Sequence, residues 1–174
     1  MIYPDLITLR AIYSNYTKIQ LEDNNEIVLL LPYYETIDMI RLVLSGANAN
    51  YDNVNRSLGR FSGINVNKYE REGSLIIMDS LKANVDSYGE EQGDEYNKNN
   101  INKNMSLMVF LNVLVRHATK RQKDGIIIVL DMGLFYHIIY DHQIQRLEKF
   151  EATIPNINLK VFCLYHQRDF ERRF

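Results

Sequence analysis

The stretch "GIIIVLDMG", residues 125–133, decides the fold class of this chain. Five consecutive aliphatic residues lead directly into Asp131, and a glycine follows two positions later. A continuous apolar run of this length is typical of a strand that is buried on both faces, as in a parallel sheet. The stretch "EIVLLLP", residues 26–32, is a second such run and is closed by a proline. Together, the two runs predict an α/β domain with a mainly parallel sheet.

Segments with a helical spacing of apolar residues lie between the strand-like runs. The predicted helices are residues 4–22, 35–46, 105–125 and 142–155, with a helical turn at 167–174. Further strands are predicted at 75–79 and 158–166, with an extended segment from residue 64 to a Glu-Gly turn and a short helix or turn at 53–63. This alternation predicts a three-layer α/β domain with helices on both faces of the sheet.

One domain accounts for the whole chain. Its 174 residues are enough for a single hydrophobic core, and no internal repeat interrupts the pattern. Residues 83–104 are polar, rich in Asn and Gly, and nearly free of aliphatic side chains. Strand-like segments occur on both sides of this stretch, so it is expected to be a flexible polar insertion within one domain, 1–174, rather than a domain boundary.

The composition argues against several classes of protein. The formal net charge is -2, from 20 basic and 22 acidic residues, which gives no general attraction to nucleic acid. The single cysteine rules out an intramolecular disulfide framework and fits a reducing compartment. The apolar runs are too short to span a bilayer, and the first ten residues do not resemble a signal peptide. The expected location is therefore cytoplasmic, with no membrane partner.

Asp131 raises the question of nucleotide binding, because a P-loop nucleotidase ends its Walker B strand with an aspartate that holds Mg²⁺. Such an enzyme also needs a glycine-rich loop with a lysine and a Ser or Thr. Here the strand at 26–32 leads into Pro32, Tyr33, Tyr34 and Glu35, without glycine or lysine. No other part of the chain reads GxxxxGK[ST]. The sequence therefore disfavours ATP hydrolysis, and an ATPase with an unorthodox phosphate site remains an alternative.

Several motifs resemble those of the MEDS family, the methanogen/methylotroph DcmR sensory domain. They are "IYSNY" in the first helix, "EIVLLLPYYET", "EGSLIIMDS", "LEKFEATIP" and "LKVFCLYHQRDF". These motifs cover most of the chain outside the Asn-rich insertion. The family is a relative of the KaiC and RecA-like ATPases that lacks a working P-loop. The resemblance thus implies a RecA/KaiC-like sheet without a Walker A loop, and a sensory role in signal transduction.

Candidate site residues follow the predicted strands, because parallel sheets bind ligands beyond the carboxyl ends of their strands. Glu35, Asp131 and His166 are expected to converge at one edge. The tyrosines at this edge would form the walls of a pocket for a small organic ligand, with further contacts from the second strand end and the last strand. These additional candidate residues are Tyr33, Tyr34, Tyr165, Asp79 and Cys163.

Each candidate also has a structural explanation. Asp131 is equally explained as a carboxylate that caps the turn after its strand. Tyr33 and Tyr34 suit a packed corner without a ligand as well as they suit a pocket, and Cys163 is also explained as a small buried hydrophobe. The histidines have no metal-ligand spacing, and no catalytic residue, metal or cofactor is predicted.

The sequence favours a non-catalytic sensory or regulatory domain. Its partner would be a small ligand or a signalling protein such as a kinase or a transcription regulator. A degenerate RecA-like scaffold that forms a homo-oligomer is the alternative from a different class, beside the ATPase with an unorthodox phosphate site.

Overall fold

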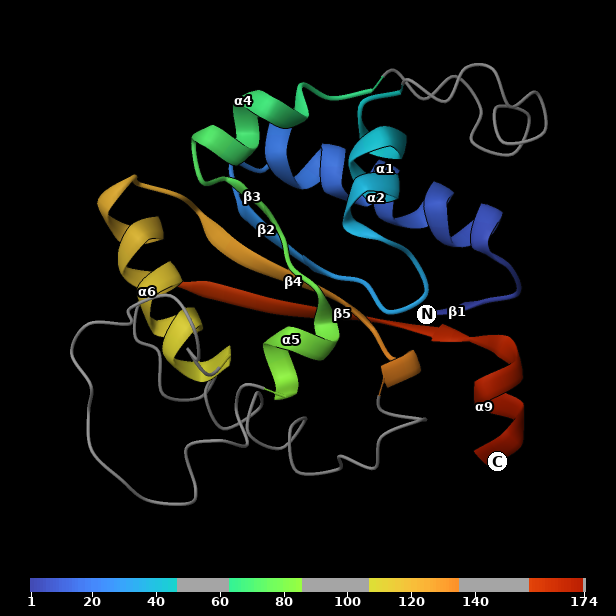
Figure 1. Ribbon diagram of the computed structural model, residues 1–174. Helices are drawn as coiled ribbons and strands as arrows, with labels where there is room; N and C mark the ends of the chain where they lie inside the picture. Colours follow the sequence, from blue (N-terminus) through green and yellow to red (C-terminus); the bar gives the residue numbers. More distant parts are fainter. Residues whose placement is uncertain (47–62, 86–106, 135–156, 174) are drawn as a thin grey trace, which may run out of the picture.

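The computed structural model describes residues 1–46, 63–85, 107–134 and 157–173 (Figure 1), and the statements that follow concern those residues. The strands are β1 (Ile2–Tyr3), β2 (Ile27–Leu31), β3 (Leu75–Ile77), β4 (Gly125–Asp131) and β5 (Asn158–His166). The helices are α1 (Leu6–Glu22), α2 (Ile37–Leu44), α4 (Val66–Arg71), α5 (Ser80–Val85), α6 (Leu107–Lys120) and α9 (Gln167–Arg173).

The described strands form one sheet in the order β1-β5-β4-β2-β3, and every neighbouring pair is parallel. β4 and β2 lie at its centre, where every residue of both strands is buried. The two apolar runs quoted above are therefore the two central strands. The prediction of a mainly parallel sheet is confirmed.

Helices cover both faces of this sheet (Figure 1). One core cluster contains Leu9 and Tyr13 of α1 and Ile40 of α2. From the sheet it contains every second residue of the central strands, such as Val28 of β2 and Val129 of β4. A second cluster on the other face contains buried side chains of α5 and α6 with the intervening sheet residues; examples are Ala83, Leu111, Leu114, Ile126 and Ile128. This arrangement matches the predicted three-layer α/β class. The more specific RecA/KaiC type stays a prediction.

Helix α1 is positioned by its N-cap and by one apolar face. Asp5 has an extended backbone and its side chain accepts the N–H of Thr8 at 2.7 Å, which satisfies one of the free donors of the first turn. Leu9, Tyr13 and Leu21 recur at helical spacing and are buried against the sheet. This orientation directs the middle of α1 toward the carboxyl end of β2.

Two sequence-based expectations are corrected by the structure, and one strand was not predicted. The segment from residue 64 was expected to be extended, but Asn65 caps the helix α4 by accepting the N–H of Lys68 at 3.0 Å. The two-residue strand β1 was not predicted, because it is defined only by pairing with β5. The polar insertion was expected to begin at Ala83, which is instead buried in α5. The predictions for 53–62, 86–104 and 142–155 lie outside the described residues.

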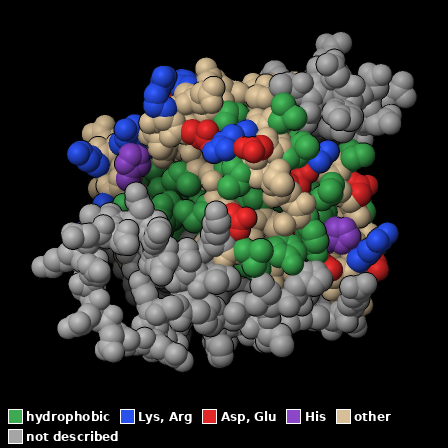
Figure 2. All heavy atoms as spheres, viewed as in Figure 1, with side chains coloured by type: hydrophobic (Ala, Val, Ile, Leu, Met, Phe, Trp, Pro, Cys, Tyr) green, Lys and Arg blue, Asp and Glu red, His purple; other side chains and the backbone are tan. Residues whose placement is uncertain are grey.

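The surface carries charges of both signs. In Figure 2, Lys and Arg side chains lie beside Asp and Glu side chains over α2 and α4. Arg41 accounts for two of these contacts, since it pairs with Asp38 at 3.2 Å and with Glu70 at 2.9 Å. No helix in the described part of the chain is both long and apolar enough to cross a membrane.

Candidate functional site

The candidate site lies where the carboxyl ends of β2, β4 and β5 meet. Residues 32–36, here called the β2–α2 corner, connect β2 to α2. Asp131 is the last residue of β4, and it lies beside this corner because β4 pairs directly with β2. Parallel strands bring their carboxyl ends to one edge of the sheet, so the expected convergence of Asp131 and Glu35 follows from the topology.

Both oxygens of the Asp131 carboxylate accept hydrogen bonds. Oδ1 accepts the hydroxyl of Tyr3 at 3.2 Å and the backbone N–H of Gly133 at 3.1 Å. Oδ2 accepts the backbone N–H groups of Tyr33 and Tyr34 at 3.4 and 3.3 Å. Three of the four donors are backbone groups whose positions are set by the loops that follow β2 and β4. The carboxylate therefore joins these two loops to β1.

Asp131 is only 4% exposed. Burial raises the pKa of its carboxyl above the ordinary value, and the hydrogen bonds from the surrounding donors act in the opposite direction. The pKa of the neighbouring Tyr3 hydroxyl is raised as well, by burial and by the nearby Asp131 carboxylate. Proton loss from either group is thus disfavoured by the same low-dielectric surroundings.

Gly133 allows two tyrosine rings to close over the site. A Cβ atom at this position would lie 2.5 Å from Cδ1 of Tyr33 and 2.5 Å from Cε2 of Tyr34. The two rings meet edge to face, with centroids 5.0 Å apart. The tyrosines that replace a phosphate loop in the sequence therefore fill the space above the turn after β4.

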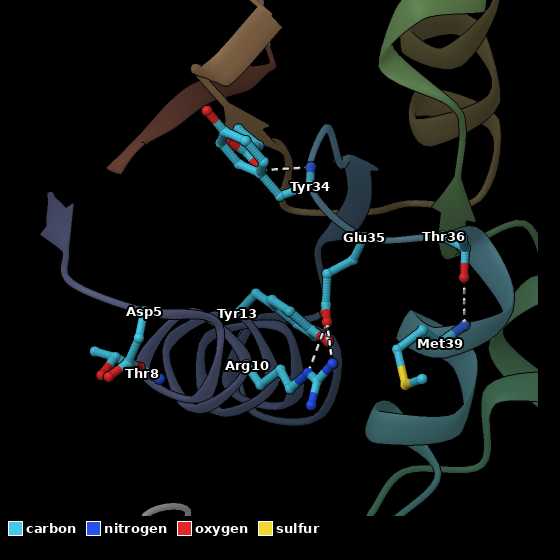
Figure 3. A network of polar contacts seen from close by, with 9 residues as sticks. Asp5, Thr8, Arg10, Tyr13, Tyr34, Glu35, Thr36 and Met39 are labelled. Carbon is cyan, nitrogen blue, oxygen red and sulfur yellow. Dashed lines mark hydrogen bonds and ion pairs between the residues drawn. The ribbon is translucent and has the colours of Figure 1, made fainter. Parts of the chain in front are cut away.

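Glu35 is held by two side chains of α1 (Figure 3). Its Oε1 accepts Nε of Arg10 at 2.6 Å, and its Oε2 accepts the hydroxyl of Tyr13 at 2.9 Å. The hydrogen bond to Glu35 raises the pKa of the Arg10 guanidinium, while burial raises the pKa of Tyr13. The Glu35 side chain is 2% exposed. Its charge is therefore balanced within the protein by a guanidinium that stays protonated.

His166 and the helix α9 complete the site. The His166 ring lies 5.2 Å from the Tyr3 ring and 5.5 Å from the Tyr34 ring, measured between centroids. The hydroxyl of Tyr34 donates to Asp169 in the first turn of α9, and Asp169 is buried. Burial raises the pKa of the Tyr34 hydroxyl, and its carboxylate partner Asp169 acts in the same direction.

A cavity of about 20 Å³ lies between α1 and the sheet at this site. It is lined by apolar side chains together with Glu35 and Asp131. A single water needs at least about 10–15 Å³ of such volume, and drug-sized ligands occupy pockets of about 300–1,000 Å³. Within the described residues, the space between the two carboxylates is therefore of the size of one water molecule.

The structure separates the predicted site residues into two groups. Asp131 pairs in register with Leu164, so Leu164 and His166 face α1. Cys163 and Tyr165 project from the opposite face of β5, where burial raises the pKa of the Cys163 thiol. Asp79 follows β3, which lies across β2 from β4. The expected wall position of Tyr165 is thus corrected, since its ring contacts Phe170 of α9 instead (centroids 6.1 Å apart).

Four residues of the site were not predicted from the sequence. Tyr3, Arg10 and Tyr13 come from the N-terminal segment, and Asp169 comes from the last helix. A carboxylate that follows a buried strand indicates a need for donors, but nothing in the sequence says which distant residues supply them. Only the position of Asp169, three residues after the predicted His166, gave a local signal.

No family model, curated protein or solved structure matches this chain. The resemblance to the MEDS family therefore stays a prediction. The described residues include no group of three or more His, Cys, Asp and Glu side chains placed to hold a metal ion.

Proposed function

We propose that this chain is a non-catalytic regulatory domain whose β2–α2 corner has a structural role. One observation carries the proposal: the Asp131 carboxylate accepts the backbone N–H groups of Tyr33, Tyr34 and Gly133. In a phosphate-binding loop, backbone N–H groups of this kind bind the anionic ligand. Here they bind a carboxylate of the same chain, so neither the donors nor the carboxylate is available to a nucleotide with Mg²⁺.

The pairing of Glu35 with Arg10 and Tyr13 supports the same proposal. A catalytic carboxylate needs access to its substrate and a proton affinity suited to the reaction. Glu35 is buried and its charge is balanced by Arg10. Each carboxylate at this edge of the sheet thus has protein partners.

The small size of this cavity argues against a small organic ligand at the β2–α2 corner itself. A space of about 20 Å³ lies far below the volume of ordinary ligand pockets. We propose a signalling protein, such as a kinase or a transcription regulator, as the partner, in line with the sensory role that the MEDS resemblance implies.

A second candidate function, an oligomerising scaffold, is favoured by the same closed corner. A closed corner requires no ligand for the fold to be complete, and a scaffold has no need of one. Light scattering after size-exclusion chromatography distinguishes the two. A concentration-independent oligomer supports the scaffold, whereas a monomer supports a domain that binds a different protein.

The proposal is tested by calorimetric titration of the protein with ATP and Mg²⁺, together with an assay of phosphate release. We expect neither saturable binding at millimolar nucleotide nor turnover. Asp131→Asn is the informative variant, and Asp38→Asn is its matched control because the Asp38 side chain is 94% exposed on α2. Binding by the wild type and the control that is lost in Asp131→Asn would replace the proposal with a nucleotide-binding function.

A further inference from the structure

The outer edge of β5 is paired along only part of its length. β5 comprises Asn158–His166, and β1 pairs with its last two residues, Tyr165 and His166. In Figure 1, β1 accordingly lies beside the carboxyl end of β5. Within the described part of the chain, no strand pairs with residues 158–162 on the side away from β4. This stretch is here called the free β5 edge.

Backbone groups of alternate β5 residues point away from β4. The C=O of Leu164 faces β4, because it accepts an N–H from the turn after that strand at 2.8 Å. The N–H of Tyr165 faces the other side, because it donates to the C=O of Met1 at 2.8 Å. Since this direction alternates along a strand, Leu159 and Val161 present their N–H and C=O groups at the free β5 edge. Among the described residues, these groups have no hydrogen-bond partner.

The free β5 edge lacks the features that protect exposed strands from pairing with other chains. Such features are prolines, bulges and charges that are not compensated. Residues 158–164 contain no proline, and they pair one to one with residues 125–131 of β4, without a bulge. Their only charged side chain, Lys160, is turned to Glu26, with 2.7 Å between Nζ and Oε1. The edge is therefore suited to accept a further strand.

The side chains along the free β5 edge define the chemistry of a matching strand. Leu159, Val161 and Cys163 are apolar and belong to the cluster on the α6 face of the sheet. Lys160 and the half-buried Phe162 alternate with them and lie on the α1 face. Cross-strand pairs of apolar side chains and of opposite charges are favourable. A matching strand thus carries aliphatic side chains on one face and an acidic side chain on the other.

A second copy of this chain is a poorer match for the free β5 edge than a strand of a different protein. Two copies related by a two-fold axis would pair antiparallel, with the outward-facing residues of odd number opposite one another. Centring the pair on Val161 would place Asn158 where Met1 of the other copy lies beside β5. Centring it on Lys160 would set two like charges directly opposite each other, which is unfavourable. Centring it on Leu159 would leave only three residues of each β5 opposite the other strand.

We infer that the free β5 edge binds an extended segment of a partner protein, which joins the sheet as a strand in line with β1. The pairing that this segment continues is already present, since Met1 forms hydrogen bonds of 2.8 Å with Tyr165 and Cys163. The added strand extends the same pairing to Val161 and Leu159. Its main-chain hydrogen bonds supply affinity, and its alternate side chains supply specificity. The inference rests on the proposed function for the existence of a protein partner, and it names the surface and the form of that partner.

The test is an NMR titration of the whole chain with the synthetic peptide acetyl-Thr-Val-Glu-Val-Thr-Val-Thr-amide, whose ends carry no charge. In the free protein, we expect fast amide exchange at Leu159 and Val161 and slow exchange at Lys160 and Phe162. The peptide should cause saturable shifts at the first two amides and slow their exchange. A peptide with lysine in place of glutamate should bind about twofold to fivefold more weakly. The same sequence with its three central amides N-methylated should not bind.

Val161→Pro tests the edge from the side of the protein. It removes an outward N–H and no bond to β4, and proline is tolerated on the solvent side of an edge strand. We expect it to weaken peptide binding roughly tenfold, the ratio that corresponds to loss of a backbone hydrogen bond. Val161→Thr is the matched control, because it has a similar shape and keeps the N–H, and its affinity should equal that of the wild type. If Val161→Pro does not fold, the three peptides still decide the question.

Several results would overturn the inference. Slow exchange at Leu159 and Val161 in the free protein would mean that the edge is covered. If that protection increased with protein concentration, a second copy would be the occupant. Absence of saturable shifts at millimolar peptide, or equal binding of the N-methylated peptide, would show that the edge does not add a strand. These outcomes do not involve nucleotide binding at the β2–α2 corner, so failure of the inference and failure of the proposed function are distinguishable.

Discussion

Two buried carboxylates at opposite ends of the sheet are stabilised in different ways. Asp131, at the carboxyl end of β4, accepts four hydrogen bonds, three of them from backbone N–H groups. Glu26 precedes β2 at the other end, where its Oε1 pairs with Nζ of Lys160 at 2.7 Å. The second oxygen of Glu26 is buried and has no hydrogen-bond partner among the described residues.

The difference between the two carboxylates lies in the kind of group that binds each of them. Backbone donors are fixed by the loops that carry them, so the surroundings of Asp131 are complete when the chain is folded. The Lys160 side chain is long and 43% exposed, so its contact with Glu26 is weakened by solvent and by lost side-chain freedom. We therefore expect a carboxyl group held by backbone donors to contribute more to stability than one paired with an exposed lysine, and the four predictions that follow test this difference.

The largest effect is expected for Asp131→Ala. This substitution leaves two buried donors, the Tyr3 hydroxyl and the Gly133 N–H, without the Asp131 acceptor, in a space with room for about one water. The N–H groups of Tyr33 and Tyr34 lose the same acceptor but are only part-buried. Each unsatisfied buried donor costs about 1–3 kcal/mol, so we expect the free energy of unfolding to fall by about 3 kcal/mol or more. Denaturation in urea measures the change. A loss below about 1 kcal/mol would show that water replaces the carboxylate.

A smaller loss is expected for Lys160→Met. Removing one partner of a fully buried ion pair costs about 3–5 kcal/mol, but exposure of Lys160 reduces the effect to about 1–2 kcal/mol. The double variant Glu26→Leu with Lys160→Met should recover most of this loss, because apolar side chains of similar volume often replace an ion pair without cost. If Lys160→Met lowers the free energy of unfolding more than Asp131→Ala does, the Glu26–Lys160 pair is the more stabilising of the two sites, contrary to our expectation.

The pH dependence of stability should reveal the buried charge of Asp131. Its folded-state pKa is raised by burial, so its contribution to stability is fully present below the unfolded pKa of about 3.9 and is lost as pH rises through the folded pKa. Across this range, the wild type should lose stability relative to Asp131→Asn, by about 1.4 kcal/mol for each tenfold difference in proton affinity. A difference that is constant with pH would mean that burial does not perturb this carboxyl.

The smallest effect is expected for Thr36→Ala at the start of α2. Thr36 Oγ1 accepts the N–H of Met39 at 3.3 Å, and Thr36 is exposed. Loss of such a cap costs only about 1 kcal/mol. The cost is small because water can bind the N–H group that loses its acceptor. The substitution thus shows what one backbone N–H contact is worth when solvent can replace the acceptor. If Thr36→Ala lowered the free energy of unfolding as much as Asp131→Ala does, burial could not explain the effect expected for Asp131→Ala.

The central part of the fold could be predicted because it is encoded in local patterns. The apolar runs of β2 and β4 specify buried parallel strands, and parallel strands place Asp131 and Glu35 at one edge. The length and position of β5 were also predicted correctly at residues 158–166. These features need only the identity and spacing of neighbouring residues.

Partners that are distant in sequence could not be predicted. Tyr3 and Asp131 are 128 residues apart, and Tyr34 and Asp169 are 135 apart. The face on which Cys163 and Tyr165 lie depends on the pairing register of β5 with β4, and a shift by one residue would exchange the two faces. The sequence therefore predicts the edge of the sheet at which the site lies, but not the distant residues that complete the site.

The most direct test of the account is an NMR titration of the backbone amides of Tyr33, Tyr34 and Gly133 with ATP and Mg²⁺. If the Asp131 carboxylate occupies these donors, their resonances should stay in place up to millimolar nucleotide and their exchange with solvent should be slow. The same amides should exchange rapidly in Asp131→Ala. Saturable shifts of these three resonances in the wild type would contradict the account, because they would show that the corner accepts a phosphate in place of its own carboxylate.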